Sequence, residues 1–113
     1  MFKIDSNKLT LGSTLDIEIV LENNPYKVFE FNQYIYVLIE PLPGTRDNNN
    51  AFCYNQFGQL VWRINYDIHP EKGCSFVDVY IKDKNLILRN WCGFKIEINP
   101  LTGEVLRKET YLK

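Results

Sequence analysis

Residue types that usually carry enzyme chemistry are scarce in this chain of 113 residues. It has one histidine, His69, which lies in a polar stretch with no nucleophile or orienting partner beside it. The three cysteines show no Cys-x-x-Cys spacing, so we expect no metal site. Glycine-rich phosphate loops are also missing, and we expect no cofactor. The sequence therefore favours a protein that is not an enzyme.

The chain also lacks an excess of charge and a long apolar run. Residues 1–60 carry four basic and seven acidic side chains, and residues 61–113 carry nine and seven, so the net charge is −1. Neither half has the basic block that a nucleic acid would attract. No stretch reaches the roughly 20 apolar residues of a membrane helix, and Met1–Ser13 lacks a signal peptide's apolar stretch. We expect no nucleic-acid partner, no membrane association and a cytoplasmic location.

The odd number of cysteines bears on the same question. Cys53, Cys74 and Cys92 are interpreted as three free thiols in a reducing cytoplasm, because the sequence shows no export signal. The alternative is one disulfide with a spare thiol. A thiol titration distinguishes the two.

What the chain has in abundance is aromatic and β-branched residues, which favour strands. Apolar and polar residues alternate over Thr14–Asn23, as in a half-buried strand. The nearly all-apolar run Tyr34–Ile39 predicts a central strand with both faces buried. Trp62 lies in an alternating strand and is assigned to the core, and Gly58 is expected to supply a positive φ in the turn before it. No segment shows a helical period.

The chain resembles a repeat of itself, with units at about 26–64 and 76–110. In each unit a hairpin is followed by a strand, an Asn, a turn that contains Gly, and a final strand. The turns are Asn55–Gly58 and Pro100–Glu104, Asn55 corresponds to Asn99, and the first unit carries an extra loop at Pro41–Asn50. We predict a single all-β domain over 1–113. About eight antiparallel strands from two repeated blade-like units would form a sandwich or a coiled sheet.

Two resemblances add to this interpretation. The segments "YNQFGQLVWRI" and "INPLTGEVLRK" resemble the outer hairpin of quinoprotein-type propeller blades, which implies a tight turn between amphipathic strands. The whole chain resembles a group of small, uncharacterised bacterial all-β proteins with such blade-like repeats. Some of these look like cytosolic immunity partners of secreted toxins. That resemblance implies that the partner is another protein, for example a toxin domain.

The candidate interaction residues are loop side chains that the core does not need. They are Arg46, Asp47, Tyr66, Asp67 and Trp91. Trp91 is the central candidate, because Trp, Tyr and Arg are enriched at interfaces, although it could instead cover the core as a hairpin lid. The resulting hypothesis is a small protein-binding protein, in its most concrete form an immunity-type inhibitor that covers a toxin's active site. The alternative is a structural or small-ligand-sensing β module without catalytic activity.

Overall fold

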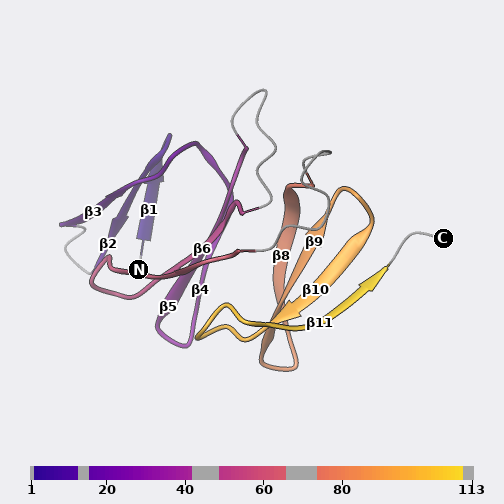
Figure 1. Cartoon of the computed structure of the whole chain (residues 1–113). Coiled ribbons are helices and arrows are strands. Elements are labelled where there is room, and N and C mark those ends of the chain that lie inside the picture. Colours follow the sequence, from indigo (N-terminus) through magenta and orange to yellow (C-terminus); the bar gives the residue numbers. More distant parts are fainter. Residues whose placement is uncertain (1, 13–15, 42–48, 66–73, 111–113) are drawn as a thin grey trace.

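The computed structural model describes residues 2–12, 16–41, 49–65 and 74–110, and these residues form eleven antiparallel strands (Figure 1). Sheet A contains β1 (Phe2–Asp5), β2 (Lys8–Leu11) and β3 (Ile17–Val20). Sheet B contains β4 (Pro25–Phe31), β5 (Tyr34–Ile39), β6 (Ala51–Tyr54) and β7 (Leu60–Arg63). Sheet C contains β8 (Phe76–Lys82), β9 (Asn85–Asn90), β10 (Phe94–Ile98) and β11 (Val105–Thr110). The described residues contain no helix that could cross a membrane.

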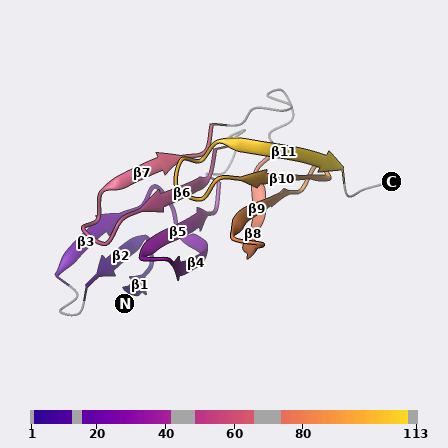
Figure 2. The same ribbon diagram turned by 90° about the horizontal axis from the view of Figure 1, so that it is seen from below.

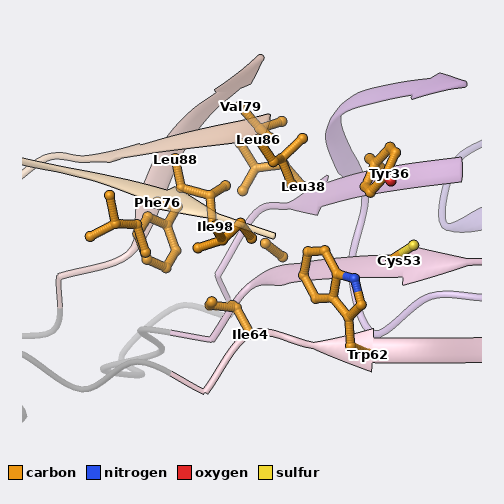
Figure 3. Packing of buried hydrophobic residues seen from close by; sticks show 12 residues of the cluster. Tyr36, Leu38, Cys53, Trp62, Ile64, Phe76, Val79, Leu86, Leu88 and Ile98 are labelled. Atoms are coloured by element: carbon orange, nitrogen blue, oxygen red, sulfur yellow. The ribbon is translucent and has the colours of Figure 1, made fainter. Parts of the chain in front are cut away.

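The three sheets are stacked with sheet B in the middle (Figures 1 and 2). One apolar cluster joins sheet A to sheet B, and a second joins sheet B to sheet C. Figure 3 shows the second cluster, in which Trp62 of β7 and Ile64, the second residue after it, approach Phe76 and Ile98 of sheet C. Burial of these facing side chains is the main favourable term that holds the stack together.

Strand β5 contributes to both clusters, as the apolar run in the sequence predicts. Tyr36 and Leu38 pack toward sheet C, whereas Ile35, Val37 and Ile39 pack toward sheet A. All five side chains are almost completely buried. The prediction of a central strand with two buried faces is therefore confirmed, and so is the core position of Trp62.

The predicted number and grouping of strands is wrong. We expected about eight strands in two units, but the described residues form three sheets of three, four and four strands. The additional hairpin is β1–β2, whose strands are four residues long and whose turn at Ser6 has a φ of 54°. Such short strands give too little alternation to stand out in the sequence. The stack is open within the described residues, with no closed propeller or barrel.

The predicted Gly turns, β6–β7 and β10–β11, each contact a neighbouring sheet. Gly58 has a φ of 80° and Gly103 a φ of 75°, so the expected positive φ is confirmed at Gly58. A Cβ at Gly58 would lie 2.6 Å from Ile17 of sheet A, and one at Gly103 would lie 2.8 Å from Trp62 of sheet B. Each turn thus packs against the preceding sheet so closely that a residue with a Cβ would clash, and only glycine fits. Sheets B and C share one strand order, but the repeat itself stays a prediction.

The outer face of the stack on sheet C is charged. Arg107 lies 3.6 Å from Glu97 and 3.5 Å from Glu109, and Lys95 lies 3.6 Å from Glu109. Exposed pairs of this kind contribute at most about 1 kcal/mol each. Their main consequence is that this face is polar and well solvated. We therefore expect apolar contacts with a partner at the ends and edges of the sheets.

Candidate functional site

One end of the molecule gathers the flanks of both long loops and the β9–β10 turn. We call this the loop end: it comprises the end of β5, the start of β6, the end of β7, the start of β8 and the turn Trp91–Gly93. Asn50 joins sheets B and C here. Its Oδ1 accepts a hydrogen bond from the Phe76 amide at 2.9 Å, and its Nδ2 donates to the carbonyls of Phe76 at 2.9 Å and Ile39 at 2.8 Å. The Asn50 side chain is fully buried, so these bonds fix the two sheets relative to each other.

Further polar contacts hold the sheet A side of the loop end. Arg63 of β7 makes a bidentate pair with Glu22, with both N–O distances at 3.0 Å, and its Nε donates to the Asn49 carbonyl at 2.8 Å. The guanidinium also lies over the Phe52 ring, 4.7 Å from its centroid. Bidentate geometry orients a side chain more strictly than a single bond does. These contacts therefore fix the segment before β4, at Glu22, and the segment before β6, at Asn49, relative to the end of β7.

Trp91 occupies the β9–β10 turn of this end, and 60% of it is exposed. The turn is tightly built: the Trp91 amide donates to the Ser75 carbonyl at 3.3 Å, and the Phe94 amide donates to the buried Asn90 Oδ1 at 2.9 Å. Gly93 has a φ of 98°. Since a core or lid residue would be mostly covered, the exposure does not fit a core role for Trp91. The turn presents a large aromatic group on a fixed backbone.

A disulfide between Cys74 and Cys92 lies directly beside Trp91. The expectation of three free thiols is therefore wrong, and only Cys53 is a free cysteine. The physical reason is the strand register. Phe76 pairs with Asn90 across β8 and β9, so the residues two positions further out, Cys74 and Cys92, stand opposite each other with their Cα atoms 5.6 Å apart.

The remaining candidate residues from the sequence cannot be placed on this surface directly. Arg46, Asp47, Tyr66 and Asp67 lie outside the described residues. The residues that flank their two loops are at the loop end, on the same end as Trp91. Asn50 and the Cys74–Cys92 pair were missed as positioning elements, although the near-symmetric placement of the two cysteines about the predicted β8–β9 hairpin was a usable signal.

The free thiol offers little chemistry. Cys53 is fully buried between Tyr36 and Trp62, its register partners on β5 and β7. Burial raises the pKa of the Cys53 thiol to about 12, against a smaller lowering by its hydrogen bond with Tyr36. Burial likewise raises the pKa of Tyr36. A thiol in this setting is protonated near neutral pH and is a poor nucleophile. Within the described residues, no group of three His, Cys, Asp or Glu side chains is arranged to hold a metal ion.

Comparison with known proteins places the chain in a family. The family model described as Domain of unknown function (DUF7957) matches residues 1–110, almost the whole chain. The chain belongs to this family. No curated protein and no solved structure shows a significant match. The family description names no activity, so function has to be argued from the surface described above.

Proposed function

We propose that this protein acts by binding another protein through its loop end, with Trp91 as the central anchor. The single observation that carries this proposal is a tryptophan, 60% exposed, on a turn held by a disulfide and by hydrogen bonds to Ser75 and Asn90. A rigid, exposed aromatic group contributes a large contact area at little cost in conformational entropy. Interface hot spots are enriched in such residues.

The neighbouring surface suits the rim of an interface. Asn24 and Asn65 are exposed where the chain enters and leaves sheet B, and Val77 on the edge strand β8 is half exposed. A polar surround that excludes water from an aromatic anchor is the usual anatomy of a binding site. We propose that Arg46, Asp47, Tyr66 and Asp67, which belong to loops leaving this end, add contacts and steer association.

In its most concrete form, the protein is an immunity-type inhibitor that covers the active site of a toxin. The resemblance to small bacterial proteins of that kind supports this version. A small-ligand sensor is the alternative, and the geometry favours it less. A crevice of about 250 Å³ between sheets A and B lies below the roughly 300–1,000 Å³ typical of pockets for drug-sized ligands.

The disulfide bears on the proposed cytoplasmic location. Disulfides persist in oxidising compartments and are rare in the cytoplasm, so Cys74–Cys92 argues for passage through an oxidising environment. A cytoplasmic location stays part of the proposal only if the pair is reduced there. Alkylation of thiols at the moment of cell lysis decides this. Three blocked cysteines would support the cytoplasm, and one would exclude it.

The test of function is affinity purification of the tagged protein from its native host after mild cross-linking. The expected result is a protein that is recovered with the wild type and lost with Trp91→Ala, while Leu101→Ala, an exposed apolar change on the β10–β11 turn, retains it. Recovery that is equal for both variants would contradict the proposed site. For the immunity version, growth of cells that produce the captured protein should depend on the wild-type chain.

A further inference from the structure

The Cys74–Cys92 disulfide lies at the margin of sheet C, outside the packed interior. The register pairs of β8 and β9 end at Phe76 and Asn90, and the two cysteines lie two positions further out. Among the described residues, neither apolar cluster includes Cys74 or Cys92. The Asn50 side chain ties Phe76 to sheet B independently, with bonds of 2.9 Å to its amide and to its carbonyl. Cleavage of the disulfide should therefore leave the sheets in place and act on the residues beyond this pair.

Two hydrogen bonds that hold the Trp91 turn are long. The Trp91 amide donates to the Ser75 carbonyl at 3.3 Å, and the Gly93 amide donates to the Asn90 carbonyl at 3.4 Å. The backbone bond that closes the β10–β11 turn is 2.8 Å long. Backbone hydrogen bonds are most frequent at about 2.9–3.0 Å and weaken as they lengthen. The covalent crosslink at Cys92 therefore contributes a large part of the order of the Trp91 turn.

The two sulfur-bearing residues differ in their access to solvent. Cys74 is 1% exposed, whereas Cys92 is partly exposed on the turn. Thiol–disulfide exchange begins when a thiolate attacks one sulfur of the disulfide, so access decides which sulfur reacts. We expect a reductant to attack the Sγ of Cys92 and the Sγ of Cys74 to leave.

We infer that the Cys74–Cys92 disulfide is a redox switch for the Trp91 turn, and that a dithiol reductant opens it. A thiolate of the dithiol attacks Cys92 Sγ, the bond between the two cysteine sulfurs breaks, and Cys74 leaves as a thiolate that takes up a proton. The second thiol of the reductant loses its proton and displaces Cys92 from the mixed disulfide, and Cys92 is protonated in turn. The protein disulfide has then gained two electrons, and the dithiol has become a disulfide.

The inference rests on the proposed function, because the consequence of the switch is a change in partner binding at Trp91. With the disulfide closed, the indole stands on a turn that is ordered before the partner arrives. With the disulfide open, the turn has to be ordered during binding, and such ordering lowers affinity. The reduced protein should therefore bind the partner about three- to tenfold more weakly than the oxidised protein.

The first experiment needs no partner. The full-length protein, labelled with nitrogen-15, is treated with dithiothreitol without denaturant and compared with untreated protein by nuclear magnetic resonance. On reduction, the amides of Trp91 and Gly93 should exchange with solvent at least roughly tenfold faster, and the Trp91 indole signal should move. The indole of Trp62, whose Nε1 donates to the Pro100 carbonyl at 2.8 Å, and the amide of Phe76 are internal controls that should not change.

A pair of single variants tests which sulfur is attacked. Cys74→Ser leaves a thiol at Cys92, which should react with iodoacetamide in the folded protein. Cys92→Ser leaves a thiol at Cys74, which should react at least roughly tenfold more slowly, because Cys74 is buried. Mass spectrometry of the peptides separates both sites from Cys53. Equal rates at the two sites would refute the assignment of Cys92 as the attacked sulfur.

The binding experiment uses the partner captured by the wild type. Affinity is measured for the oxidised protein, the reduced protein and the double variant Cys74→Ser, Cys92→Ser. The last two should bind equally and about three- to tenfold more weakly than the first. In Trp91→Ala, which keeps the disulfide, the remaining affinity should not respond to reduction, because the switch acts through the indole.

Several results would overturn the inference. A disulfide that stays closed in the folded protein under excess dithiothreitol would do so, and so would a Trp91 turn that exchanges equally in both states. Loss of protection throughout the chain would show that reduction unfolds the protein instead of releasing one turn. A released turn with equal affinity in both states would refute the switch and leave the proposed function standing. Absence of Trp91-dependent binding in either state would refute both.

Discussion

Replacement of Gly103 by alanine should weaken the contact between sheets B and C. The new Cβ would lie 2.8 Å from Cδ2 and 2.9 Å from Cγ of Trp62, too close for either atom to remain in place. Trp62 has little room to move, because its Nε1 donates to the Pro100 carbonyl at 2.8 Å and its ring is buried. Forcing an extra methyl group into a packed site costs about 1–3 kcal/mol. Alanine at positive φ costs about 1–2 kcal/mol more.

The expected loss of unfolding free energy for Gly103→Ala is therefore about 2–5 kcal/mol. Gly12→Ala is the matched control, because Gly12 also has a positive φ, 92°, but its nearest neighbouring atom would lie 3.7 Å away. That variant should lose only the conformational cost of about 1–2 kcal/mol. Urea unfolding followed by circular dichroism measures both. Equal losses within about 0.5 kcal/mol would show that the β10–β11 turn does not press on Trp62 as described.

Three further predictions concern the loop end and the interior. Asn50→Ala should lose about 3 kcal/mol of unfolding free energy, because three buried hydrogen bonds disappear; the exposed Asn24→Ala should change it by less than about 0.5 kcal/mol. Thiol titration of the denatured, unreduced protein should count one thiol, and a count of three would disprove the disulfide. The double variant Cys74→Ser, Cys92→Ser should lose about 3 kcal/mol of unfolding free energy, because the crosslink closes a loop with a sequence separation of 18. Because burial raises the folded pKa of the Cys53 thiol to about 12, the protonated thiol adds to the free energy of unfolding, and this stabilisation is fully present below the unfolded pKa of about 8.5. It falls by up to about 1.4 kcal/mol per pH unit as the pH rises toward 12. Urea unfolding at pH 8 and pH 10 should show that loss, and an equal loss in Cys53→Ala would refute its assignment to the thiol.

The features that follow from local pattern were predictable. Strand β5, the turns at Asn55 and Asn99, and the burial of Trp62 all depend on alternation and turn chemistry that a short window contains. Strands β1 and β2 were missed because each has only four residues, and of these β1 buries none and β2 buries two. In β2 these are Leu9 and Leu11, whose role becomes clear only when sheet B covers them.

Features that depend on contacts between distant segments were not predictable in the same way. Asn50 belongs to a run of asparagines that is typical of a solvated loop, yet its side chain reaches Phe76, 26 residues further along, and is buried. The disulfide could be predicted only from the register of β8 and β9, which places Cys74 opposite Cys92. The close approach of Gly58 to Ile17 requires sheet A to lie beside the β6–β7 turn, and no local sequence pattern contains that arrangement. The exposure of Trp91 likewise depends on the arrangement of the sheets, which leaves the β9–β10 turn outside both apolar clusters.

The central claim, that the protein binds a partner through Trp91, is tested most directly by one pair of measurements on Trp91→Ala. Affinity for the captured partner and melting temperature are determined together on the same preparation. Because Trp91 is 60% exposed, we predict a melting temperature close to that of the wild type and an affinity weaker by about 2 kcal/mol, or roughly thirtyfold. A variant that melts far below the wild type yet binds the partner normally when folded would contradict the claim.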